Sequence, residues 1–164
     1  MRATVLSAIL AAGVSFGAAT LEAQTSANIQ ATATVLSALN VTGAANLVFG
    51  NVTPGVNKTV AIADAGAGRF DVVKAANSAL TLSFTLPATL DDGGNTLPIG
   101  TWTGAWNTSA TPAGATAFDP TSATNTALDA GTTISVYVGA TVTPAAAQAA
   151  GSYTGTVTMS AVYF

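Results

Sequence analysis

The chain has 164 residues, which is enough for one domain of ordinary size, and only 7% of them are charged, against about 25% in typical globular domains. With four Lys and Arg residues and a net charge of −3, it lacks the basic footprint of a nucleic-acid-binding protein. Histidine and cysteine are absent, which removes the commonest general base, the commonest transition-metal ligands and all thiol chemistry.

The N-terminal segment has the pattern of a secretory signal peptide. Arg2 precedes an apolar run over residues 3–19, and the small residue Ala23 follows a short polar stretch. A charged start, an apolar middle and small residues at a cleavage point are typical of export signals, so we expect a signal peptide over residues 1–23. A transmembrane anchor is the alternative, although the run is shorter than the ~20 residues that a spanning helix needs.

Residues 27–37 are the first strand pattern after that segment. Apolar and polar side chains alternate there with the period of two that a β-strand requires. The apolar row consists mainly of small residues: Ala27, Ile29, Ala31, Ala33 and Val35. The segment either pairs within its own domain or is donated to another chain, and the alternation of side chains is the same in both cases.

Short strand patterns separated by turns follow. Alternating runs occur at residues 59–63, 69–75 and 79–86, and Pro87 ends the last of them. That last run is the clearest, because its apolar residues share one face: Leu80, Leu82, Phe84 and Leu86. Before these runs, residues 52–55 place Pro and Gly where a type II turn prefers them.

Turn and loop signals are frequent in the second half of the chain. Residues 91–95, Asp-Asp-Gly-Gly-Asn, have the composition of a tight turn. Residues 109–130 are rich in Thr, Ala and Pro, and we expect them to form a long loop. Residues 132–142 alternate as a strand, and residues 144–151, which begin with Pro and end with Gly, predict one or two helical turns.

Residues 151–164 alternate strictly up to the end of the sequence. One face carries Tyr153, Gly155, Val157, Met159, Ala161 and Tyr163, and the other is mainly Thr and Ser. A strand edge exposes a row of unpaired backbone groups, so we expect another strand to pair beside this one.

These patterns add up to seven to nine short strands, with turns between them and no amphipathic helix longer than two turns. They favour an all-β fold, an immunoglobulin-like β-sandwich, with a barrel as the alternative. The domain is expected to span residues 38–164, after a signal peptide and an N-terminal strand over residues 24–37.

Two motifs near the ends of this domain resemble those of pilin subunits. Gly151 and the penultimate Tyr163 lie on a terminal alternating strand, as in chaperone–usher pilins. Together with Leu47-x-Phe49-Gly50 and Ala150-Gly-Ser-Tyr-Thr-Gly-Thr-Val157, they resemble a family of small exported bacterial proteins of unassigned function related to spore-coat-protein-U-type pilins. The chain departs from many pilin subunits in having no cysteine, and so no disulfide.

The resemblance implies an incomplete sandwich that lacks its last strand. In such fibres the N-terminal extension of the next subunit fills the groove, and a periplasmic chaperone fills it before assembly at an outer-membrane usher. Carried over to this chain, the donor residues are Ile29, Ala31, Ala33 and Val35. The acceptor groove is flanked by the terminal-strand residues Tyr153, Val157, Met159, Ala161 and Tyr163. The implied function is that of a secreted structural subunit, self-assembled into an adhesive cell-surface filament (fimbrium).

The acidic residues give no sign of an active site. Asp91 and Asp92 lie in a turn composition, and a Ca²⁺ loop would usually need a distal Glu, which the chain after residue 23 lacks. The missing histidine excludes a Ser-His-Asp triad, and no Ser-Lys motif surrounds Lys58 or Lys74. We therefore expect no enzyme activity, no cofactor or metal, no small-molecule substrate and no nucleic-acid partner.

Trp102 and Trp106 support the competing hypothesis. Spaced by four residues on a strand, both would point to one face, where they could stack against a sugar. The protein would then be a monomeric secreted or surface binding domain for glycans. The alternative is that both side chains fill the core, as large aromatic residues usually do.

Overall fold

The computed structural model describes residues 26–123, 125–128 and 131–164. The chain divides into two units, Met1–Thr34 and Val35–Phe164. In the first unit, residues 26–34 are exposed and form no strand with any other described residue. The signal peptide expected over residues 1–23 lies outside the described residues.

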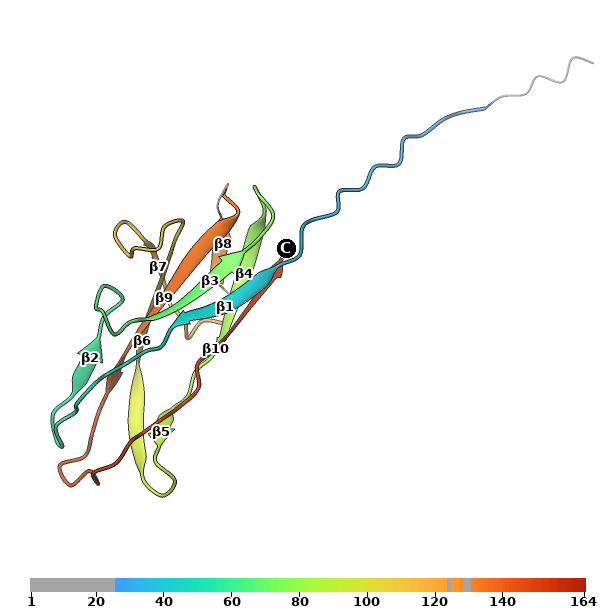
Figure 1. Ribbon diagram of the computed structural model, residues 1–164. Coiled ribbons are helices and arrows are strands. Elements are labelled where there is room, and N and C mark those ends of the chain that lie inside the picture. The colour runs from blue at the N-terminus through green and yellow to red at the C-terminus, as the bar shows by residue number, and fades with distance from the viewer. Residues whose placement is uncertain (1–25, 124, 129–130) are drawn as a thin grey trace, which may run out of the picture. The chain divides into compact units, whose positions relative to one another are not determined.

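The second unit contains ten strands among its described residues and no helix (Figure 1). In chain order they are β1 (Asn40–Ala45), β2 (Lys58–Val60), β3 (Gly68–Val73), β4 (Ala79–Thr85), β5 (Thr89–Asp91), β6 (Thr96–Asn107), β7 (Thr116–Phe118), β8 (Asn125–Leu128), β9 (Thr133–Val142) and β10 (Thr158–Tyr163). Accordingly, the part of the chain that the structure describes has no helix long and apolar enough to cross a membrane.

The strands form two curled antiparallel sheets, which confirms the all-β prediction. The larger sheet has the order β1-β3-β9-β6-β5, with β2 also paired to β9 and β7 to β6. The smaller sheet has the order β10-β4-β8. A single bridge between Asp91 and Thr154 links β5 to the segment that precedes β10.

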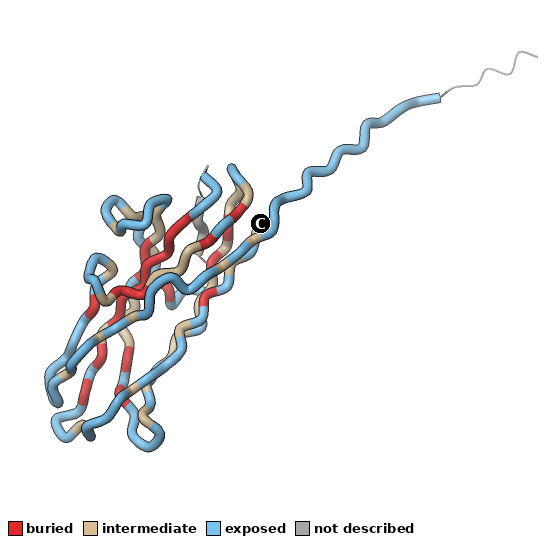
Figure 2. The backbone as a smooth tube through the Cα atoms, in the orientation of Figure 1, coloured by how far each residue is buried: buried red, intermediate tan, exposed pale blue. Residues whose placement is uncertain are grey.

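Strand β9 lies at the centre of the larger sheet and is buried on both faces (Figure 2). Its inner row is the predicted apolar row: Ile134, Val136, Val138, Ala140 and Val142. The opposite face is covered by the loop after β6, where the Tyr137 hydroxyl donates to the Ser109 carbonyl at 3.1 Å. The alternation therefore predicted the strand correctly but not the burial of its second face.

The core consists of two clusters along this strand. The first cluster comprises Val72, Leu80, Leu82, Ile134, Val136 and Met159. The second cluster comprises Leu97, Ile99, Ala140 and Val142. Strand β6 passes from one to the other through a bulge between Gly100 and Thr103, where Thr101 has a φ of 46°.

Three sequence-based expectations need correction. The long loop predicted over residues 109–130 contains β7 and β8. Instead of helical turns, residues 144–151 contain one turn, in which the Gln148 amide donates to the Ala145 carbonyl at 3.0 Å. The terminal strand begins at Thr158 rather than near residue 151, and Thr158 pairs with Thr85, the last residue of β4.

Candidate functional site

Each sheet ends in a strand with one unpaired edge, and both edges border the same region. Among the described strands, β1 pairs only with β3, and β10 pairs only with β4. Val41 from β1 and Ala161 from β10 both pack against the first cluster. The two edges are therefore neighbours across the core, although they do not pair with each other.

A cavity of about 1130 Å³ opens where the chain leaves these two edges, and we refer to it as the edge groove. One wall is formed by residues between Gly43 and Pro54, and the other by Gln148–Val157. Its floor is apolar and comes from the second core cluster and the strands around it: Phe70, Leu90, Leu97, Ile99, Val138 and Val142. These floor side chains are buried or half-buried beneath the two walls.

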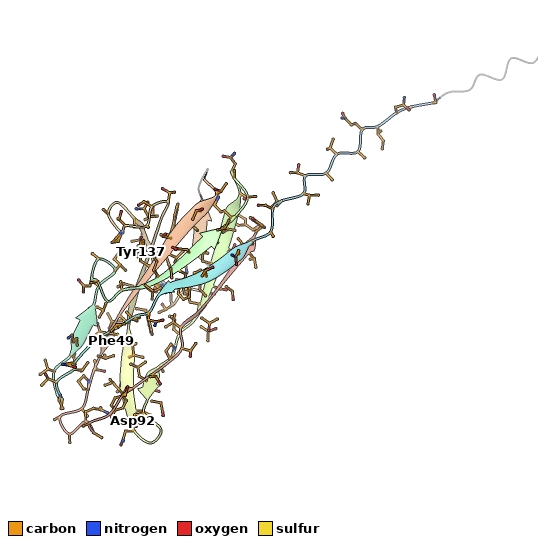
Figure 3. The ribbon with its side chains drawn as sticks, viewed as in Figure 1. Phe49, Asp92 and Tyr137 are labelled. Atoms are coloured by element: carbon orange, nitrogen blue, oxygen red, sulfur yellow. The ribbon has the colours of Figure 1, made fainter. Side chains whose placement is uncertain are left out.

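The first wall has no regular secondary structure after the end of β1 and is positioned by two glycines. The Val48 amide donates to the Gly66 carbonyl at 2.8 Å, and the Leu47 Cβ would lie 3.3 Å from a Cβ added to Gly68. Phe49, labelled in Figure 3, belongs to this wall and packs with Leu47 against the second cluster. Small residues at 66 and 68 therefore allow the wall to lie close to β3.

The second wall carries the Gly-x-Tyr-x-Gly motif of residues 151–155, and the structure explains both glycines. A Cβ at Gly151 would collide with the Asp92 carboxylate, and a Cβ at Gly155 would lie 2.7 Å from Leu90 Cδ2. Between them, the Tyr153 hydroxyl donates to the Ala149 carbonyl at 2.8 Å and accepts from Gln148 Nε2 at 2.7 Å. The motif holds this wall against β5 and the turn that follows it.

Backbone groups on both walls lack partners within the domain. On the second wall, Thr154 exchanges two backbone hydrogen bonds with Asp91, at 2.8 and 2.9 Å. For residues 155–157 no backbone hydrogen bond to another described residue is present outside the regular ladders. The groove therefore offers unpaired N–H and C=O groups beside apolar surface, which is what an added β-strand requires.

The turn beside the second wall is the one predicted at residues 91–95. The Asp91 carboxylate accepts from the Gly93 amide at 2.6 Å, and the Asp92 carboxylate accepts from the Asn95 amide at 2.7 Å. The hydrogen bond from the Asn95 backbone is the main cause that holds the pKa of Asp92 below its usual value. Both carboxylates thus accept hydrogen bonds from backbone amides within the turn that the composition predicted.

The five predicted acceptor residues share one face of the C-terminal segment but fall into two groups. Tyr153 and Val157 line the edge groove. Met159, Ala161 and Tyr163 lie beyond its end and pack against the first cluster. The Tyr163 hydroxyl accepts from the Ala75 amide at 2.7 Å and donates to the Ser37 carbonyl at 3.1 Å, which ties the end of the chain to the segment before β1.

The predicted donor residues Ile29, Ala31, Ala33 and Val35 are all exposed. The exposed fractions of Ile29 and Val35, 95% and 93%, leave both apolar side chains almost fully in solvent.

The two tryptophans pack against different clusters. Trp106 packs against the first cluster and Trp102 against the second. Trp102 also borders a separate depression of about 480 Å³, together with Ile62 and Phe118. The bulge in β6 separates the two side chains, so the spacing of four does not produce one shared aromatic platform.

Sequence reasoning missed most of the first wall and the role of Gln148. Leu47 and Phe49 belong to the motif that carries the resemblance, but residues 46–52 have no strand periodicity that would place them beside a groove. The closely spaced Gly66 and Gly68 were an available signal, since paired glycines often mark a close approach of another backbone.

The comparisons with known proteins identify a family without assigning an activity. No curated protein matches the chain. A family model described as "Domain of unknown function (DUF4402)" matches residues 39–163, a stretch that includes all ten strands and both walls of the edge groove. The description names no activity and no relation to pilins. On the extent of this match, the chain belongs to the DUF4402 family.

Proposed function

We propose that this protein is the structural subunit of an extracellular bacterial fibre, which polymerises by donating its N-terminal strand, residues 24–37, to the edge groove of a neighbouring subunit. One observation carries the proposal: an apolar groove opens where the chain leaves two unpaired strand edges, and the exposed N-terminal segment of the same chain has the alternation of a strand. The domain in this view is an incomplete immunoglobulin-like sandwich.

The lengths of the groove and the segment agree. The second wall runs over Gln148–Val157, and a strand of that many residues spans ~33 Å at ~3.3 Å per residue. The alternating segment at residues 27–37 has eleven residues, one more than the ten of the second wall. One donated strand can therefore cover the wall from end to end.

The energetics favour such an addition. Each ladder hydrogen bond contributes about 0.5–1.5 kcal/mol net, and burial of apolar surface adds ~25 cal/mol per Å². Because the donor segment and the acceptor groove are different parts of one chain, repeated donation is heterologous, and it builds an open filament when the rotation between successive subunits does not close into a ring. The scarcity of charged residues leaves few groups that would have to be desolvated in the contact.

The proposal also includes export and assembly partners. A chain with an N-terminal signal peptide would reach the periplasm, where a chaperone would cover the edge groove until an outer-membrane usher brings subunits together. The product would be an adhesive cell-surface filament.

Deletion of residues 24–36 tests the proposal directly. We expect a soluble domain that does not polymerise and that binds a synthetic peptide of residues 26–36. A peptide of the same length with Asp in place of Ile29 and Val35 is the control and should not bind, because charged side chains would face the apolar floor. If the deletion unfolds the domain as a monomer, the segment belongs to its own domain and the proposal fails.

Electron microscopy of the extracellular fraction supplies an independent test. Filaments should be visible, and gel electrophoresis of unheated samples should show a ladder that collapses to one band on boiling, as expected for strand exchange with high kinetic stability. A single small species in both assays would instead support the monomeric binding domain.

A further inference from the structure

One end of the edge groove is closed by a bridge between its walls. The lining reaches Pro54 at the end of the first wall and Pro144, which precedes the second wall. The residue after each proline takes part in the bridge, in which the Gly55 amide donates to the Ala145 carbonyl at 3.0 Å. The two walls are thus joined at the point where the groove ends.

Each side of this bridge is held by further hydrogen bonds. Gly55 lies in the predicted turn with a φ of 74°, and the Val56 amide donates to the Thr53 carbonyl at 3.1 Å. On the other side, Gln148 Oε1 accepts from the Ala145 amide at 3.3 Å, and Gln148 Nε2 donates to the Thr96 carbonyl of β6 at 3.1 Å. The bridge is therefore anchored to the larger sheet.

The donated segment needs such a feature because its own side chains define its position poorly. If the donated strand shifted by one residue, its apolar row would face solvent, and the loss of apolar burial disfavours this register. A slip by two residues preserves the alternation, and the row is mostly alanine, with Ala31 and Ala33 at its centre. Side-chain shape alone distinguishes such slips weakly.

We propose that the Gly55–Ala145 bridge is the register stop of the edge groove: it ends the groove so that the donated strand of a second copy of this chain binds in one register. The inference rests on the proposed function, because it concerns how the donated strand is positioned. The stop excludes the two-residue slips that the alanine row would permit.

Disulfide trapping can measure the register, because the chain has no cysteine of its own. One copy carries Thr156→Cys on the second wall, where residue 156 is exposed. The other copy carries a single cysteine in place of Gln30, Thr32 or Thr34, which share the polar row of the donor. Successive positions in this row are ~6–7 Å apart, whereas a disulfide needs Cβ atoms within about 4.5 Å, so each register favours one pair.

With the bridge intact, we expect one of the three pairs to form its disulfide at least about tenfold faster than the others, a difference of ~1.4 kcal/mol. Gly55→Ala strains the turn, because an L-residue disfavours this φ and the new Cβ would lie 3.4 Å from Ala146 Cα. The preference should then fall below about threefold. Gln148→Ala, which frees the other side of the bridge, should have the same effect.

Gly114→Ala is the matched control, because Gly114 has a φ of 73° but no atom within 4 Å of an added Cβ. It should leave the preference unchanged. Equal rates for the three pairs with the bridge intact, or an unchanged preference in both Gly55→Ala and Gln148→Ala, would overturn the register stop. If no disulfide joins two subunits in any pair, the proposed strand donation itself fails, which is a distinct result.

Discussion

Gly66→Ala should damage the first wall of the edge groove while leaving both core clusters intact. A Cβ at this position would collide with the Val48 carbonyl oxygen and would lie 3.5 Å from Val60 Cγ1. The colliding atom belongs to the backbone, so a side-chain rotation cannot relieve the contact. The wall must move, and the hydrogen bond from the Val48 amide to the Gly66 carbonyl, now 2.8 Å, must lengthen.

The expected cost follows from these contacts. Overpacking of a well-packed site costs about 1–3 kcal/mol, and the loss of the hydrogen bond adds ~1 kcal/mol. We therefore expect the free energy of unfolding to fall by about 2–4 kcal/mol, a large share of the ~5–15 kcal/mol of a typical domain. Polymerisation should slow as well, because the displaced wall no longer matches an incoming strand.

Urea unfolding followed by tryptophan fluorescence measures the first effect, and a filament assay at equal protein concentration measures the second. Gly43→Ala is the control, because it lies in β1 beside the same groove and an added Cβ would have no atom within 4 Å. Its stability should stay within about 1 kcal/mol of the parent. Equal stability and equal polymerisation of Gly66→Ala and Gly43→Ala would refute the close contact between the wall and Gly66.

Lys74→Met should lower the free energy of unfolding by about 2–4 kcal/mol, since the Lys74 residue is 1% exposed and its Nζ donates to the carbonyls of Ala75, Ser78 and Gly131. The exposed Lys58→Met should cost less than about 1 kcal/mol in the same urea titration. Tyr163→Phe removes the acceptor of the Ala75 amide and should lower the free energy of unfolding by about 1–2 kcal/mol. Hydrogen exchange at the Ala75 amide should become faster, and an unchanged exchange rate would contradict the prediction. The hydrogen bond from the Asn95 amide lowers the pKa of Asp92 in the folded state. The ionised Asp92 carboxylate therefore stabilises the fold above the unfolded pKa of ~3.9, and this stabilisation is lost as the pH falls through the lower folded pKa. Asp92→Asn should therefore weaken the acid dependence of the urea midpoint, and an identical pH profile would contradict this role.

The all-β fold could be predicted because regular alternation marks strands whose inner face is buried. The predicted strands at residues 79–86 and 132–142 correspond to β4 and β9, and Leu80, Leu82 and the inner row of β9 are buried as expected. In each case the signal lies in the strand itself, since the side chains on one face are apolar and those on the other are small or polar.

Strands β7 and β8 could not be predicted in the same way. They have three and four residues, and their composition is that of the surrounding loop. Their pairing is supplied by partners, β6 for one and β4 for the other, which tertiary contact determines rather than local propensity. The same holds for the face of β9 that contains Ser135 and Tyr137, which is buried by a loop distant in sequence.

The two walls of the candidate site differ in the same way in how far they could be predicted from the sequence. The second wall was located from its motif, because the glycines and Tyr153 lie in one alternating segment. The first wall depends on Gly66 and Gly68, about twenty residues away, and the bridge depends on a backbone pair between Gly55 and Ala145. Contacts of this kind leave little trace in local sequence.

The hydrogen bond between Tyr163 and Ser37 has a consequence for folding kinetics. It joins residues separated by 126 positions, and β10 completes the smaller sheet only when the last residues of the chain are present. Folds that depend on such distant pairings fold slowly, on a scale of about milliseconds to seconds. Until β10 has formed and paired, β4 therefore lacks one of its two partner strands.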